Sequence, residues 1–273
     1  MSPSNRSPAT RVVRVRLNGT REERPDVLSS EQPLELRLKG EGIAIVMRTP
    51  GSDRELAAGF ALTEGLIETP DQLIEVSHCR RGTAEHPENI INLFLDPKTP
   101  VDLERLSRHV FASSSCGICG KASIEAIQNN WPPIESSFSI RSRTLLALPE
   151  RLRKAQEQFE QTGGLHAAAL FTSEGQLVCL REDVGRHNAV DKVIGWSVLN
   201  GSFPPDHHLL LVSGRTSFEI MQKALAARIP LVAAISAPSS LAVEFAQENH
   251  QTLVGFLRES TFNIYAQPQR VED

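Results

Sequence analysis

Leu209-Leu210-Leu211-Val212-Ser213-Gly214-Arg215-Thr216 is the stretch that decides the fold. It opens with four consecutive large apolar residues, a run far too short to cross a bilayer and typical of a strand buried on both faces. The run passes directly into a small polar turn, and a helix is expected over 216–227. A buried strand that leads into a helix is the repeating unit of an α/β sheet.

The same alternation extends from this stretch in both directions. The elements expected in the C-terminal half are a helix from Pro149 to about Gly163, a hairpin of strands at 165–171 and 176–180, a helix at 186–199, a strand at 231–235, a helix at 239–247, a buried strand at 253–257 and an edge strand at 262–265. Strands and helices in this order predict a sheet that helices cover on both faces.

The first hundred residues have a different pattern. Strands are expected at 11–17, before the turn Asn18-Gly19, and at 34–38, 42–48, 73–76 and 90–95, with one helix that Asp53 caps and that ends near Gly65. This predicts a small α+β unit. We therefore divide the chain into a disordered tail (1–10), a small α+β domain (11–110), a mobile cysteine loop and linker (111–148) and an α/β domain (149–273).

Composition and charge exclude several classes of protein. A hydrophobic fraction of 40% over 273 residues is enough for a real core. The net charge of −4 gives no general attraction for nucleic acid, and no apolar run is long enough for a membrane span. Residues 1–8 lack the apolar segment of a signal peptide, so we expect a cytoplasmic protein that binds neither nucleic acid nor membrane.

Two of the four cysteines lie where chemistry is expected. Ser113-Ser114-Ser115-Cys116-Gly117-Ile118-Cys119-Gly120-Lys121 places two thiols among small residues in an open loop. The start of an expected helix and Lys121 both favour the thiolate form. The pair is also half of a zinc site, which His78 and Cys79, His166 or Cys179 would have to complete, and it has the spacing of a redox pair. Cys179 lies inside an expected strand, where a lone cysteine is most often a small core residue.

Three polar segments follow expected strands, at the sheet edge where α/β proteins bind ligands. The first is 181–192, with Asp183, Arg186, His187 and Asn188 at the start of a helix. A helix start of this kind could hold an anion, but Asp183 as a helix cap, Lys192 in a surface ion pair and His187 as a satisfied histidine explain the same residues.

The other two segments are shorter. Ser213, Gly214 and Arg215 combine a close backbone approach with a bidentate guanidinium, which fits a phosphate or pyrophosphate. The segment 255–263 ends the last buried strand and could place an aromatic ring and an arginine on either side of a base.

Together, Ser115–Gly120, Glu182–Lys192 and Ser213–Arg215 form a distinctive ordered set. The set resembles the formate dehydrogenase accessory sulfurtransferase (FdhD) family, and the likeness extends from about residue 11 to the C-terminus. The resemblance implies a sulfur carrier that takes sulfur from a cysteine desulfurase as a persulfide. It would deliver this sulfur to the bis-molybdopterin guanine dinucleotide cofactor (Mo-bisPGD), which formate dehydrogenase requires.

The resemblance also implies roles for particular residues. Cys116 corresponds to the persulfide-bearing residue and Cys119 to its partner. The guanine-nucleotide segment falls on Phe256, Leu257, Arg258, Glu259, Ser260 and Thr261. Glu259 would repel a phosphate, so this segment is expected to contact base or ribose. Asp183, Arg186, His187, Asn188, Ser213, Gly214 and Arg215 would hold the rest of the cofactor, and GDP or GMP would mimic it.

The family's C-terminal domain is similar to the cytidine deaminase fold, but the residues of deaminase chemistry are replaced in this chain. Ser213-Gly214-Arg215-Thr216 stands where a deaminase has its Pro-Cys-x-x-Cys, and His187-Asn188 replaces its His-x-Glu. No metal ligands are therefore expected, and an arginine in the metal's place suits an anion. Burial of so large a cofactor indicates a homodimer. A zinc-binding or redox interaction protein and a cofactor-binding chaperone without sulfur chemistry remain as alternatives.

Overall fold

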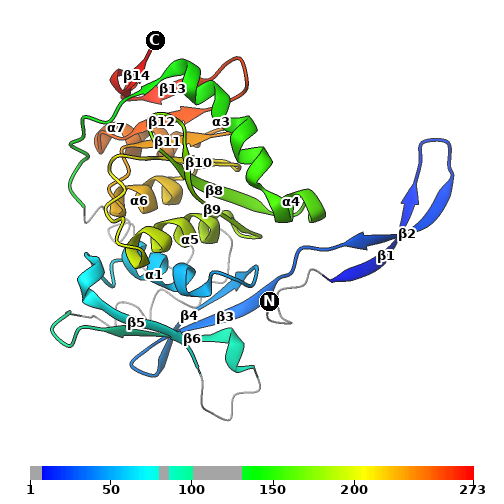
Figure 1. Cartoon of the computed structure of the whole chain (residues 1–273), viewed down its shortest axis with the longest axis horizontal. Helices are drawn as coiled ribbons and strands as arrows, with labels where there is room; N and C mark the ends of the chain where they lie inside the picture. The colour runs from blue at the N-terminus through cyan, green and yellow to red at the C-terminus, as the bar shows by residue number, and fades with distance from the viewer. Residues whose placement is uncertain (1–7, 80–85, 101–130) are drawn as a thin grey trace.

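The C-terminal half is built on a six-stranded sheet. The structure, a computed structural model, describes residues 8–79, 86–100 and 131–273 (Figure 1). The strands are β8 (His166–Phe171), β9 (Leu177–Asp183), β10 (Leu209–Val212), β11 (Leu231–Ala234), β12 (Thr252–Gly255) and β13 (Asn263–Ala266), in the spatial order β13-β12-β11-β10-β8-β9. β10, β11 and β12 are parallel, while β8 and β13 run antiparallel to their neighbours. The expected hairpin and the expected edge strand are confirmed.

Helices cover both faces of this sheet (Figure 1). On one face lies α3 (Ser142–Ala155), and on the other lie α5 (Arg186–Leu199), α6 (Phe218–Ala226) and α7 (Ser240–Glu248). Successive strand residues point to opposite faces, so Leu209 and Leu211 pack with the α3 side while Leu210 and Val212 pack with α5 and α6. The predicted two-sided α/β architecture is confirmed.

Individual helix boundaries agree with the sequence to different degrees. α5 has the predicted bounds, and α6 begins two residues later than predicted, at Phe218. The prediction for α3 is wrong, because the helix starts at Ser142 and contains Pro149 in its interior. α3 ends at Ala155, and a separate short helix, α4 (Glu157–Thr162), ends at Gly163 in the left-handed conformation. An interior proline removes one helical hydrogen bond, a loss that the packing of one face of α3 against the sheet outweighs.

The segment before α3 is also more structured than a linker. Ile134, Phe138 and Ile140 are buried, and the short strand β7 (Ile140–Arg141) pairs in parallel with β14 (Val271–Glu272) near the C-terminus. Residues 131–148 therefore belong to the C-terminal core, whereas 111–130 lie outside the described residues.

The N-terminal half contains a four-stranded sheet in the order β4-β3-β6-β5. Its strands are β3 (Gln32–Leu38), β4 (Glu41–Arg48), β5 (Leu73–His78) and β6 (Ile90–Leu95), and short 3-10 turns at Pro70–Gln72 and Pro87–Asn89 precede β5 and β6; a third, Pro268–Arg270, precedes β14. α1 (Asp53–Thr63) covers one face. The predicted α+β unit is confirmed, but Asp53 is not the cap: Ser52 is the capping residue, and Asp53 pairs with Arg48 instead.

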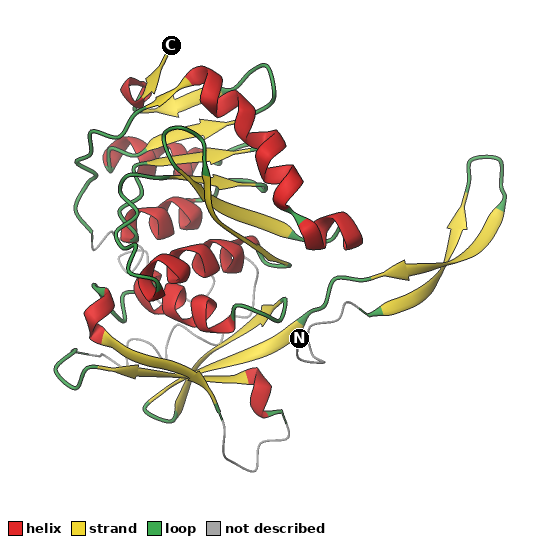
Figure 2. Ribbon diagram, viewed as in Figure 1, coloured by secondary structure: helices red, strands yellow, loops and turns green. Residues whose placement is uncertain are grey.

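The first strand belongs to a separate hairpin. β1 (Ala9–Val15) pairs with β2 (Arg21–Val27), and this ribbon projects from the body of the molecule (Figure 2). β2 was not predicted, because its sequence, Arg-Glu-Glu-Arg-Pro-Asp-Val, is poor in the residues that favour strands.

α1 and α5 join the two halves by a close crossing. A Cβ on Gly59 would lie 1.9 Å from the carbonyl oxygen of Asp191, and one on Gly195 would lie 1.8 Å from that of Glu55. Only glycine permits this approach at either position. The buried side chains of the two halves form one continuous core across it. No helix in the described part of the chain is long and apolar enough to span a membrane.

Candidate functional site

The sheet topology places the predicted polar segments along one edge. β9, β10, β11 and β12 all end at this edge, and β8, which is antiparallel to both of its neighbours, begins there with His166. The segments that follow β9, β10 and β12 are therefore neighbours in space. This is the edge at which open α/β sheets bind ligands.

The first two segments meet at His166. Ser213 Oγ accepts a hydrogen bond from the Ala167 amide at 2.9 Å. The backbone at Gly214 lies against the imidazole, since a Cβ there would be 3.3 Å from His166 Nδ1 and 3.7 Å from Arg186 Cδ. Ser213, Gly214, Arg186 and His166 thus lie side by side, and we call this group, together with Arg215, the edge cluster.

The edge cluster carries positive charge. Arg215 is exposed and forms no ion pair or hydrogen bond with any residue that the structure describes. The pKa of His166 is lowered, first by burial and then by the positive charges of Arg186, His187 and Arg215, and the nearby Asp183 opposes this only in part. α5 and α6 begin beside the cluster without a side-chain cap on their first amides. Helix starts and arginines together form a site suited to an anion.

His187 is held within the chain. Its Nε2 lies 2.8 Å from a carboxylate oxygen of Glu219 and 3.3 Å from Ser217 Oγ. Both contacts are made by the same ring nitrogen, so the three residues do not have the geometry of a catalytic triad, in which the two partners use opposite nitrogens. The interpretation of His187 as a satisfied histidine is confirmed. It borders the edge cluster.

Asp183 and Lys192 form a buried ion pair. Lys192 Nζ lies 2.7 Å from Asp183 Oδ2, and the two side chains are 2% and 0% exposed. Asp183 also accepts hydrogen bonds from the amides of Thr49 and Gly185. Two predictions are wrong here: the N-cap of α5 is Gly185, and Lys192 is in the interior, because the loop after β4 packs over both side chains.

Asn188 completes this connection between the two halves. Its side-chain amide donates to Met47 O at 2.7 Å and to Asp183 Oδ1 at 3.0 Å. Lys192 Nζ in turn donates to Thr49 O. Asp183 and Asn188 therefore lie where the sequence predicted, but their described contacts position the β4–α1 loop.

The third predicted segment continues along the same edge. Phe256 is 41% exposed, and Arg258, Glu259, Ser260 and Thr261 are exposed, whereas Leu257 is buried in the core. The Phe256 and Leu257 amides donate to Ser236 O and Ala234 O, in and after β11. The loop that contains Ser236 also bonds to Thr216, which follows the edge cluster directly. The structure thus aligns this segment with the other two, while Leu257 can contribute to a ligand only through its backbone.

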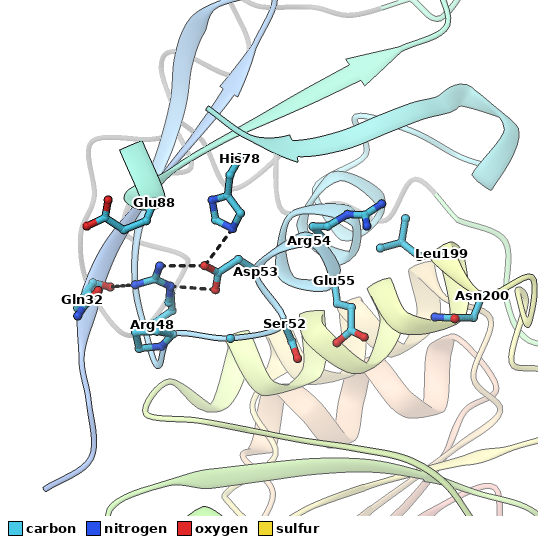
Figure 3. A pocket seen from close by; sticks show the side chains of 12 residues that line it. Gln32, Arg48, Ser52, Asp53, Arg54, Glu55, His78, Glu88, Leu199 and Asn200 are labelled. Carbon is cyan, nitrogen blue, oxygen red and sulfur yellow. Dashed lines mark hydrogen bonds and ion pairs between the residues drawn. The ribbon is translucent and has the colours of Figure 1, made fainter. Parts of the chain in front are cut away.

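A well-defined pocket of the described residues lies elsewhere, between the start of α1, the end of α5 and the four-stranded sheet (Figure 3). It has a volume of about 630 Å³, and no motif in the sequence pointed to it. Arg48 binds Asp53 through two hydrogen bonds of 2.9 and 3.0 Å, and His78 Nε2 lies 3.5 Å from the same carboxylate. Arg54 donates to Val76 O. Arg48 and Arg54 therefore already have hydrogen-bond partners within the chain.

Comparison with known proteins places the chain in a family. The profile of the FdhD/NarQ family matches residues 29–272. The chain belongs to the FdhD/NarQ family. Among its relatives, a sulfur carrier protein FdhD from Streptomyces avermitilis is 48% identical over 270 residues, with coverage of 96% of this chain and 94% of the relative. One from Sulfurisphaera tokodaii is 41% identical over 264 residues, with coverage of 96% and 97%.

A solved structure shares the fold. A putative formate dehydrogenase accessory protein from Desulfotalea psychrophila superposes with a TM-score of 0.77 over 97% of this chain and 99% of that one, at 24% identity. Family membership and the mixed α/β fold predicted from the sequence are both confirmed.

The two motif cysteines of this FdhD/NarQ family member, Cys116 and Cys119, lie outside the described residues. Cys179 is buried in β9, and burial raises the pKa of its thiol to about 12. A thiol that stays protonated is unreactive, so its interpretation as a core residue is confirmed. Within the described residues, no three His, Cys, Asp or Glu side chains are grouped to hold a metal ion.

His166 lies in the edge cluster, but the sequence indicated it only as a possible zinc ligand, because a histidine at the start of an expected strand belongs to no motif. The signal was its place two residues after Gly163-Gly164, at the first position of β8, but the order of the strands was needed to show that β8 starts at the edge where the polar segments lie.

Proposed function

We propose that this chain receives sulfur as a persulfide on Cys116 and delivers it to Mo-bisPGD bound at the edge cluster. The observation that carries the proposal is the edge cluster itself, where Arg215 has no partner among the described residues, in a chain whose relatives are named sulfur carriers. A carrier must hold both the sulfur and its recipient, and an anion site beside the predicted base-contacting segment suits the second task.

The first step is an exchange between two persulfides. The Cys116 thiolate attacks the outer sulfur of the persulfide on a cysteine desulfurase, so that a new S–S bond forms at Cys116 and the S–S bond of the desulfurase breaks. The electron pair of the broken bond leaves as the desulfurase thiolate, and no external oxidant is needed. Such exchange requires the attacking thiol to be ionised and accessible. Cys119 is the partner that relays or resolves the sulfur.

The cofactor is the recipient of this sulfur. Arg186, Arg215 and the Ser213 hydroxyl would hold its pyrophosphate, and Gly214 keeps this turn packed against His166 and Arg186. His187 and Asn188 border this place, and Asp183 positions the loop around it. The exposed ring of Phe256 is suited to stack on guanine, with Arg258, Glu259, Ser260 and Thr261 beside it. GDP and GMP then serve as stand-ins for the cofactor.

The partners follow from this chemistry. The chain would meet a cysteine desulfurase and a formate dehydrogenase in turn, in the cytoplasm, and would act as a homodimer in which two protomers share one cofactor. The alternatives, a zinc or redox interaction protein and a chaperone without sulfur chemistry, differ in what they require of Cys116.

One experiment separates these possibilities. The purified chain is incubated with a cysteine desulfurase and cysteine, and intact-mass spectrometry is expected to show a gain of one sulfur on Cys116. Cys116→Ala should lose this gain and should yield inactive formate dehydrogenase. The control Cys179→Ala removes a buried thiol and should keep the sulfur. Normal formate dehydrogenase activity with Cys116→Ala would overturn the relay and favour the chaperone, and stoichiometric zinc in the purified chain would favour the metal-binding alternative.

A further inference from the structure

His166 occupies a special position in the edge cluster. It is the first residue of β8, and a Cβ on Gly214 would lie 3.3 Å from its Nδ1 and 3.4 Å from its Cε1. The next residue, Ala167, donates a hydrogen bond to Ser213 Oγ and accepts one from the Ser213 amide. These two bonds fix the start of β8 against the turn that follows β10. The imidazole is half-buried and borders the turn that the proposed function assigns to the pyrophosphate. A ligand at this turn would meet His166 as well as the arginines.

The groups that face His166 are mainly cationic. Arg186 and His187 come from the start of α5, and Arg215 comes from the turn before α6. The acidic group on this side is Asp183 at the end of β9, and its carboxylate already pairs with Lys192. Glu219 pairs with His187. Without an anion, a proton on His166 would therefore add one more positive charge to a half-buried, cation-rich site.

We infer that His166 is a proton-dependent contact for the anion at this edge: it is neutral in the empty site and binds a proton when a diphosphate occupies it. The inference rests on the proposed function, since it concerns the same anion site. An added diphosphate reverses the balance of charge around the ring, because its negative oxygens offset Arg186 and Arg215 and offer a hydrogen-bond acceptor to the imidazolium.

A histidine has an advantage over a third arginine here. A permanently charged side chain would repel its neighbours in the empty site, whereas an imidazole becomes charged only when the ligand is present. It also lets the site weaken its hold on the anion by losing a proton. A carrier that must release its cargo benefits from such a contact.

The sign of the pH dependence follows from linkage. The empty site holds His166 with a lowered pKa, and the occupied site raises it, so binding takes up protons. Affinity must then increase as the pH falls through the interval between the two pKa values. One linked proton changes the dissociation constant by at most about tenfold per pH unit in that interval.

The test is calorimetric titration of the full chain with GDP, with pyrophosphate and with guanosine, from pH 6 to pH 8 and in two buffers of different ionisation enthalpy. We expect proton uptake with GDP and with pyrophosphate and none with guanosine. His166→Gln should abolish the uptake and flatten the pH profile. His207→Gln is the control, since His207 is exposed before β10, at the opposite edge of the sheet, and it should behave as the unmodified chain.

The outcomes distinguish the two proposals. If the unmodified chain binds neither GDP nor pyrophosphate, the anion site of the proposed function is wrong and the inference falls with it. If it binds GDP without proton uptake, only the inference is overturned. Should His166→Gln fail to fold, the imidazole resonances of the unmodified chain, followed by NMR against pH, decide the matter: a pKa of His166 that does not rise when GDP is added would contradict the inference.

Discussion

Two arginine-containing regions of this protein, the edge cluster and the pocket of Figure 3, differ in how their arginines are paired. In the pocket, Arg48 is 2% exposed and is bound through two hydrogen bonds to Asp53. Nearby, Arg181 pairs with Glu55 between β9 and α1. At the edge cluster, Arg215 is exposed and has no partner among the described residues. Arg48 and Arg181 are thus neutralised by the chain, whereas Arg215 is not paired with any described residue.

The buried pairs connect the two halves of the molecule. Lys192 and Asp183 belong to the C-terminal half, yet both bond to Thr49 in the loop after β4. Lys223 in α6 likewise pairs with Asp191 and Glu64, the latter at the end of α1. These charges are tied to tertiary structure, whereas Arg215 is available for a ligand. Substitutions in a buried pair and in the edge cluster should therefore have different effects on stability and on binding.

The largest effect is expected for Lys192→Met. The methionine keeps most of the volume but leaves the Asp183 carboxylate buried without its charge partner, which costs about 3–5 kcal/mol. Urea unfolding measures the loss of stability. The double variant Asp183→Asn with Lys192→Met removes both charges and should recover a large part of it. A stability loss below about 1 kcal/mol in the single variant would show that this pair does not hold the two halves together.

A smaller effect, and on binding alone, is expected for Arg215→Ala. The side chain touches no described partner, so the free energy of unfolding should stay within about 0.5 kcal/mol of the unmodified chain. The loss of one hydrogen bond to a charged group should weaken GDP binding by roughly 10- to 100-fold in calorimetry, which corresponds to about 1.5–3 kcal/mol. Arg215→Ala with unchanged GDP affinity would remove the main argument for the anion site.

The smallest effect is expected for Arg16→Ala. Arg16 pairs with Glu22 at 3.0 Å on the projecting hairpin, and both side chains are more than half exposed. Exposed pairs contribute about 0–1 kcal/mol, so stability should hardly change. The variant removes the same charge as Arg215→Ala at a distant place, so its GDP affinity should be unchanged. A tenfold loss in both variants would mean that net charge, and not the edge cluster, governs binding.

Many of the strands and helices could be predicted from local sequence patterns. The apolar runs at 209–212 and 231–235 and the bounds of α5 could be predicted because a buried strand and the start and end of a helix are encoded within a few neighbouring residues. The motif at 182–192 identified the family for the same reason. Where the encoding is not local, the prediction was wrong: the packing of α3 overrides Pro149, and β2 forms from a sequence that does not favour strands.

By itself, the sequence determined the alternation of strands and helices, the family and the residues of the edge cluster other than His166. Only the tertiary structure decided which of the polar residues carry a charge that no other described residue neutralises. Asp183, Lys192 and Arg215 are equally polar in the sequence, but the fold brings Thr49 over the first two and leaves the third at the edge. The same order of strands sets His166 beside Gly214. The physical reason is that burial and pairing depend on contacts between residues distant in the sequence, such as those of Thr49 with Asp183 and Lys192 across more than a hundred positions, which no local pattern contains.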